Sequence, residues 1–119
     1  MSEADFQKQV LELCKHLGLL TYHTYDSRRS QPGFPDLVIV GRDHMLYREL
    51  KTDTGRVSAE QIQWLEALRR LGVDADVWRP KDWPTRVHKE LQALGSLSSK
   101  MVPPSQAEIR KRLAKGSML

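Results

Sequence analysis

The feature that most constrains the fold of this chain is a pair of short apolar segments, residues 36–41 and 44–51. They read DLVIVG and HMLYRELK, and both are rich in the β-branched, long aliphatic and aromatic residues typical of strands. Only an Arg-Asp pair separates them, so the pattern predicts an antiparallel hairpin with a tight turn. In the register that such a turn imposes, Asp36 lies opposite Glu49.

Two carboxylates that face each other across a hairpin repel, because cross-strand Cβ atoms lie roughly 4.5–5.5 Å apart. A divalent cation between Asp36 and Glu49 would remove the repulsion, and oxygen ligands suit a hard ion such as Mg²⁺ or Mn²⁺. Side chains alternate along a strand, so Glu49 and Lys51 share a face while Leu50 points away. The spacing alone is equally consistent with a solvated hairpin face that follows a Pro-Asp turn.

Hydrophobic periodicity and capping residues outline the other elements. Ser2 and Ser58 are candidate N-caps, each directly before a helical pattern. The expected helices span residues 2–17, 59–71 and 82–95, the further strands span residues 19–26 and 73–80, and residues 27–35 form a loop. The order helix, three strands, helix, strand, helix predicts an α/β fold with a mixed sheet and helices packed on its faces.

The first helix contributes a third acidic residue. At about 100° per residue, Phe6, Val10 and Leu13 define the core face. Glu3 falls at the edge of that face and can lean toward the sheet, whereas Glu12 falls on the opposite side. A favourable charge at a helix N-terminus explains Glu3 equally well.

Composition indicates one domain with a tail. Residues 1–95 carry the core pattern, and residues 96–119 are a Ser/Pro-rich linker and a basic segment that forms either a short helix or a disordered tail. The net charge of +4 resides in that tail, which has five basic residues and one acidic residue. This charge makes nucleic acid a plausible partner. The single cysteine excludes an internal disulfide, no segment is apolar enough to cross a membrane, and a cytoplasmic location is expected.

Two stretches together resemble a known family. The motif GFPDLVIV…YRELK and the following GRVSAEQIQWLEALRRLGVDADVWRP resemble the VRR-NUC group of the PD-(D/E)XK nuclease superfamily. The resemblance runs from about Glu3 to Trp83. It implies a restriction-endonuclease-like fold with an α-β-β-β-α-β core, a C-terminal helix and tail, and metal-dependent phosphodiester cleavage.

The resemblance also implies roles for individual residues. Asp36 and Glu49 match the metal-binding acids, Lys51 matches the lysine of the motif, and Gln61 matches the glutamine of the following helix. Glu3 matches the glutamate of the N-terminal helix. The backbone carbonyl of Leu50, between the acid and the lysine, is a further possible ligand.

We therefore expect a Mg²⁺- or Mn²⁺-dependent endonuclease that cleaves DNA, with structure-selective action on Holliday junctions or flaps as in standalone phage and bacterial members of the family. Arg28, Arg29 and Arg42 are expected to flank the acids and hold phosphates, with solvated loop charges as the alternative. The alternative functions are a non-catalytic DNA-binding module of the same fold and a simple nicking nuclease. A homodimer in a bacterial or phage-infected cell is expected, with Trp64, Val77-Trp78 or the tail at its interface.

Overall fold

The computed structural model describes residues 1–24, 31–97 and 106–114, apart from the side chains of residues 108 and 112. Its helices and strands are α1 (Glu3–His16), β1 (Leu20–His23), β2 (Leu37–Val40), β3 (Met45–Leu50), α2 (Ala59–Arg70), β4 (Ala75–Trp78), α3 (His88–Ala93) and α4 (Gln106–Ala114). A 3₁₀ turn, η2 (Pro80–Asp82), and a π-helical turn, η3 (Trp83–Val87), connect β4 to α3.

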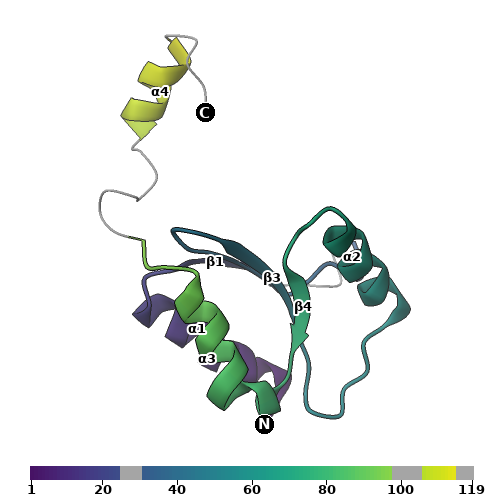
Figure 1. Cartoon of the computed structure of the whole chain (residues 1–119). Coiled ribbons are helices and arrows are strands. Elements are labelled where there is room, and N and C mark those ends of the chain that lie inside the picture. Colours follow the sequence, from purple (N-terminus) through teal and green to yellow (C-terminus); the bar gives the residue numbers. More distant parts are fainter. Residues whose placement is uncertain (25–30, 98–105, 115–119) are drawn as a thin grey trace.

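The strands form one mixed sheet in the order β1-β2-β3-β4. β2 runs antiparallel to both β1 and β3, and β4 runs parallel to β3. Helices α1 and α3 cover one face of the sheet, and α2 lies against the opposite face (Figure 1). This arrangement confirms the predicted α/β fold and the order of its core elements.

The hairpin has the predicted register. Leu37 pairs with Arg48 and Val40 pairs with Met45, and the amide of Gly41 donates to the carbonyl of His44 to close the turn. Asp36 is one residue before β2 and Glu49 is the penultimate residue of β3, so both acids lie at the same end of the sheet.

The core lies between the sheet and the pair α1 and α3. Phe6 and Val10 of α1 are fully buried, as their helical spacing predicted, and Cys14 is fully buried beside them. They pack with other buried side chains of this cluster, including Leu37, Ile39, Leu46, Leu50, Trp78, Val87, Leu91 and Leu94. Leu13, the third residue of the predicted core face, is half-buried. Burial of this apolar surface ties both ends of β2 and β3 to the helices and so fixes where the acids stand.

Arg48 is a charged side chain within that core. It is 2% exposed, and its guanidinium donates to Glu90 at 2.9 Å and to Asp74 at 2.8 Å. Its guanidinium carbon lies 5.1 Å from the centre of the Trp78 ring. These contacts join β3 to β4 and α3 on the face opposite to Glu49, because neighbouring side chains of a strand point to opposite faces.

The third predicted helix is broken where the sequence contains proline. The prediction was one helix over residues 82–95, but η2, η3 and α3 follow one another from residue 80 to residue 93. Pro84 lies inside this stretch and has no amide hydrogen to donate to the preceding turn, so a regular α-helix begins only at His88, after the 3₁₀ and π turns.

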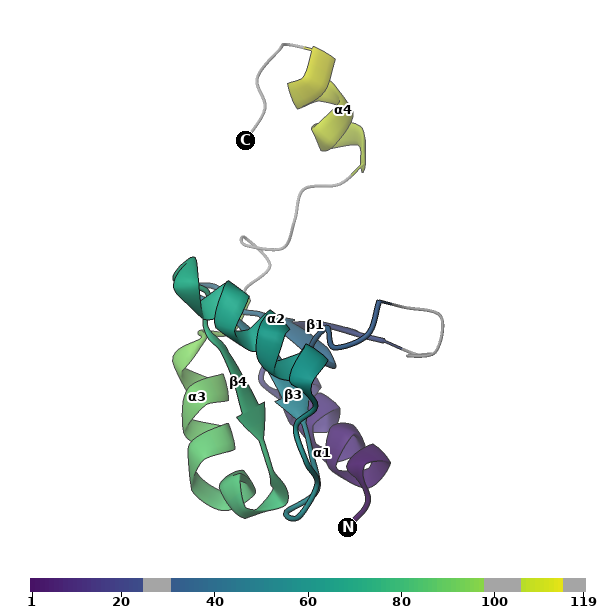
Figure 2. The same ribbon diagram turned by 90° about the vertical axis from the view of Figure 1, so that its right-hand side faces the viewer.

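The prediction that Trp78 contributes to a subunit interface is wrong for its side chain, which is fully buried. Trp64 lies on α2 and its ring packs edge-on against Phe34, with 5.1 Å between ring centres. The basic segment forms a helix, α4, which stands apart from the sheet in two perpendicular views (Figures 1 and 2).

Contacts with the sheet domain extend two residues beyond the predicted boundary at residue 95. The amide of Leu97 donates to the carbonyl of Gly18 at 3.0 Å. Ser96 lies against Gly18, whose φ of +72° is the left-handed conformation common after a helix. In the described ranges 1–24, 31–97 and 106–114, no helix combines the length and the apolar character needed to cross a bilayer.

Candidate metal centre

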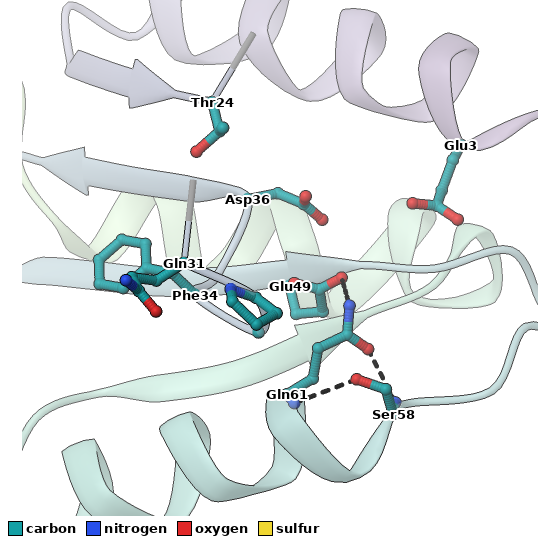
Figure 3. A pocket seen from close by; sticks show the side chains of 10 residues that line it. Glu3, Thr24, Gln31, Phe34, Asp36, Glu49, Ser58 and Gln61 are labelled. Carbon is teal, nitrogen blue, oxygen red and sulfur yellow. Dashed lines mark hydrogen bonds between the residues drawn. The ribbon is translucent and has the colours of Figure 1, made fainter. Parts of the chain in front are cut away.

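Three carboxylates from three different elements converge at one end of the sheet. Glu3 comes from the first turn of α1, Asp36 precedes β2, and Glu49 is on β3. One oxygen of each lies within 4.8 Å of the others. Together they line one side of a pocket of about 330 Å³, whose other walls come from the loop before β2, from Thr24 and from the start of α2 (Figure 3).

Glu49 is the most buried of the three acids, with 2% of its surface exposed. Its Oε2 accepts a hydrogen bond of 2.9 Å from the side-chain amide of Gln61. Its Oε1 is buried and has no hydrogen-bond partner among the described residues. Burial, and then the nearby Asp36, raise the pKa of Glu49 from 4.5 to about 8, although Lys51 acts in the opposite direction.

Asp36 is held by the backbone of the facing strand. Its Oδ2 accepts a hydrogen bond of 2.8 Å from the amide of Leu50. This bond places Leu50 beside the acids, as the predicted motif requires. The role of the Leu50 carbonyl as a metal ligand stays a prediction.

The loop that carries Asp36 is docked on α2. Gly33 has a φ of +94°, and a Cβ atom there would lie 2.5 Å from the carbonyl oxygen of Glu60. The next residue, Phe34, packs edge-on between Tyr47 of β3 and Trp64 of α2, with ring centres 6.1 Å and 5.1 Å apart. The glycine therefore allows a close approach that a larger residue would prevent, and the aromatic ring secures it.

The start of α2 brings Gln61 to the site. Ser58 caps the helix as predicted, and together with Gln61 it forms a complete capping box. The amide of Ser58 donates to Gln61 Oε1 at 2.8 Å, and Ser58 Oγ accepts from the amide of Gln61 at 3.1 Å. The side-chain NH₂ group of Gln61 donates to Glu49 Oε2.

Lys51 lies next to the carboxylate cluster. Its Nζ is 3.7 Å from Glu49 Oε2, and its side chain is 13% exposed. This confirms the expectation that Glu49 and Lys51 share a face of the strand. The ammonium group offsets part of the negative charge of the cluster.

The residues present fit a hard divalent cation. Three carboxylates supply only oxygen ligands, which suit Mg²⁺ or Mn²⁺. Glu49 Oε1 is buried without a hydrogen-bond partner among the described residues, and a buried oxygen in a protein interior rarely lacks one. Burial, and then repulsion from Asp36, raise the pKa of Glu49, so its charged form is costly until a positive charge lies between the two acids.

Of the three predicted phosphate-binding arginines, Arg42 belongs to the described residues, and it is not part of this cluster. Arg42 lies in the turn at the far end of the hairpin from Asp36 and Glu49, so the expectation that it flanks the acids is wrong. Its guanidinium pairs with Asp43 at 3.1 Å. Arg28 and Arg29 lie outside the described residues.

Sequence reasoning missed part of the pocket wall. The additional lining residues are Thr24, Gln31, Pro32, Gly33, Phe34 and Ser58. Ser58 was identified only as a helix cap. The Gly-Phe-Pro sequence directly before Asp36 was an available signal, since a glycine beside a predicted site residue indicates a close backbone approach.

Comparison with known proteins gives a consistent result. The family model described as VRR-NUC domain matches residues 2–82. The solved structure of a VRR_NUC domain protein is 22% identical, covering 81% of this chain and 92% of that chain with a TM-score of 0.61. A solved structure of the Holliday junction resolvase Hjc of Archaeoglobus fulgidus is also 22% identical, covering 65% of this chain and 68% of that chain with a TM-score of 0.48. No curated protein matches the chain. The first likeness shows a shared fold, and the predicted restriction-endonuclease-like fold is confirmed.

Proposed function

The chain belongs to the VRR-NUC family, and from this premise we propose that it is a divalent-metal-dependent deoxyribonuclease that hydrolyses DNA phosphodiester bonds. One observation carries the proposal. Glu3, Asp36 and Glu49 bring three carboxylate oxygens within 4.8 Å of one another at the wall of a pocket, with Lys51 beside them. Metal-dependent phosphodiester hydrolysis needs carboxylates that hold the metal and a positively charged side chain beside them.

The acidic residues would hold the cation. Asp36 is oriented by the Leu50 amide and Glu49 by Gln61, so both carboxylates are set in place before a metal binds. Glu3 approaches from α1 and completes the set. When bound, Mg²⁺ or Mn²⁺ would polarise a phosphoryl oxygen and lower the pKa of a water molecule.

Lys51 has a separate role in this proposal. Its ammonium group lies 3.7 Å from Glu49 Oε2 and is fixed on the same face of β3. From there it can offset the negative charge that accumulates on a phosphate during hydrolysis. Gln61 orients the carboxylate, because its side-chain NH₂ group donates to Glu49 Oε2.

Branched DNA is the proposed substrate, and a homodimer the proposed assembly. Both follow from the expected likeness to standalone family members that dimerise and act on junctions or flaps. One site cuts one strand, so a two-fold pair of sites suits a junction with two scissile phosphates. The basic tail, with five basic residues and one acidic residue, supports binding to the phosphate backbone.

A non-catalytic DNA-binding module is the second candidate, and the burial of Glu49 argues against it. A module that only binds DNA has no use for a buried carboxylate with an unpartnered oxygen beside two other acids. A neutral residue there would make such a module more stable.

Cleavage assays test the proposal directly. The full chain is incubated with four-way junction, flap, duplex and single-stranded DNA in the presence of Mg²⁺, Mn²⁺ or EDTA. We expect cleavage with either metal, none with EDTA, and the highest rate on a branched substrate. Asp36→Asn should lose at least about 100-fold in rate, while Glu12→Gln, which neutralises an exposed carboxylate on the same domain, should cleave normally. If Asp36→Asn cleaved DNA at the wild-type rate, the proposed metal centre would have no role in the reaction.

Light scattering tests the assembly. We expect a mass of twice that of the chain at micromolar concentration. A mass near 13.7 kDa would show a monomer and would favour a nicking enzyme.

A further inference from the structure

The N-terminal cap of α2 determines which way the Gln61 side chain points. The amide hydrogen of Ser58 needs an acceptor, and Gln61 Oε1 provides one at 2.8 Å. The Ser58 hydroxyl holds the first turn of the helix in place by accepting from the Gln61 backbone amide at 3.1 Å. With its oxygen directed at Ser58, the Gln61 side chain directs its NH₂ group away from the cap.

The opposite orientation is excluded by the hydrogen-bonding groups on both sides. If the side-chain amide of Gln61 were flipped, its NH₂ would face the N–H of Ser58, which is a second donor. Its oxygen would then face Glu49 Oε2, a second acceptor, at about the present 2.9 Å. Only the observed orientation satisfies both neighbours.

The orientation has a consequence for Glu49. The Gln61 donor engages Oε2, which Lys51 also approaches, and so fixes the rotation of the carboxylate. The other oxygen, Oε1, stays without a partner among the described residues. One Glu49 oxygen is therefore anchored by protein, and the other is available.

We propose that Ser58 is a positioning residue for the cation. It acts through Gln61: its hydroxyl holds the first turn of α2, and this keeps the Ser58 backbone amide in position to donate to Gln61 Oε1. Gln61 in turn presents Glu49 to the metal. The inference rests on the proposed function and adds a residue that does not itself touch metal or DNA. It makes the capping box part of the shell that supports the metal ligands, and not only a stabiliser of α2.

A double-mutant cycle on Mn²⁺ binding tests this inference. Mn²⁺ affinity is measured by calorimetry for the full-length wild type, Ser58→Ala, Gln61→Ala and the double variant. Ser58→Ala keeps the backbone amide that donates to Gln61 Oε1 but removes the hydroxyl that holds this turn in place. We expect it to weaken Mn²⁺ binding about tenfold in the wild-type background, the usual loss for a residue that supports a ligand. In the Gln61→Ala background, the same substitution should change the Mn²⁺ affinity less than about twofold, because the Gln61 side chain through which Ser58 acts on Glu49 is already missing.

Two further variants separate positioning from general destabilisation. Arg69→Ala removes the contacts of the other end of α2 with Ala75 and Asp76, so it should lower the melting temperature without weakening Mn²⁺ binding. Ser58→Thr retains a capping hydroxyl and should restore Mn²⁺ affinity to within about threefold of wild type.

The outcomes are distinct. Equal losses from Ser58→Ala in both backgrounds, or no loss in either, would overturn the inference while leaving the metal centre intact. A wild-type chain that binds no Mn²⁺ would overturn the proposed metal centre and the inference together.

Discussion

Neutralising Glu49 should stabilise the metal-free protein at neutral pH. Glu49→Gln keeps the shape of the side chain, and its remaining carbonyl oxygen can still accept the hydrogen bond from Gln61. It removes a carboxyl group that is buried beside Asp36 and Glu3, where ionisation is disfavoured. The substitution therefore removes the group whose ionisation the folded state disfavours.

The size of the effect follows from the pKa of Glu49. Burial and the neighbouring acids raise this pKa from 4.5 to about 8, so the folded protein keeps a proton that the unfolded chain releases. The contribution of Glu49 to the free energy of unfolding is thus greatest below pH 4.5 and falls as the pH rises toward 8. Each pH unit between these two pKa values lowers the free energy of unfolding by about 1.4 kcal/mol. The wild type therefore loses about 3 kcal/mol of stability between pH 5 and pH 7.5 that Glu49→Gln does not lose.

Urea unfolding in EDTA at several pH values measures this difference. The free energy of unfolding of Glu49→Gln minus that of wild type should rise by about 3 kcal/mol from pH 5 to pH 7.5. Groups that titrate alike in both proteins cancel in the subtraction. Saturating Mg²⁺ should stabilise the wild type and not the variant, because binding to the folded state alone stabilises it.

Glu12→Gln is the control for the loss of one negative charge, since Glu12 is exposed on α1. A stability difference between Glu49→Gln and wild type that stays constant from pH 5 to pH 7.5 would refute the reasoning. It would mean that Glu49 is not a strained carboxylate in the folded protein.

Three other predictions concern neighbouring parts of the chain. Lys51→Ala should lower the cleavage rate by about 100-fold while changing Mn²⁺ affinity less than about threefold; calorimetry that shows the reverse would contradict its role. Gly33→Ala should lower the free energy of unfolding by more than about 2 kcal/mol in urea titrations, because its Cβ would meet the Glu60 carbonyl, whereas Gly72→Ala has the same positive φ with nothing within 4 Å and should cost clearly less. Truncation after Leu97 should leave a folded domain that binds DNA more weakly and with a shallower dependence on salt; an unchanged affinity at low salt would show that the tail does not touch DNA.

Local chemistry determined the parts of the structure that the sequence predicted well. The apolar segments and tight turn of the hairpin set the register that brings Asp36 opposite Glu49. Ser2 and Ser58 mark the starts of α1 and α2 because a hydroxyl there satisfies a free amide. These features depend on residues close together in the chain, so a pattern in the sequence is sufficient to identify them.

Other properties of the site depend on elements that meet only in the folded molecule. Sequence spacing left Glu3 equally explained as a helix-end charge, and the packing of α1 on the sheet brings it to the other acids. The turn with Arg42 appeared close to the site in sequence, yet the length of the hairpin carries it to the opposite end.

The sequence by itself determined the order of elements, the hairpin register and the identity of the central acids. Only the tertiary structure decided that Glu49 is buried with one oxygen unpartnered, that Gln61 holds the other, and that the loop with Gly33 rests on α2. The physical reason is that register and capping arise from contacts between near neighbours in the chain. Burial, and the pKa that it shifts, arise from long-range packing of α1, β3 and α2 around one point, which no local pattern encodes.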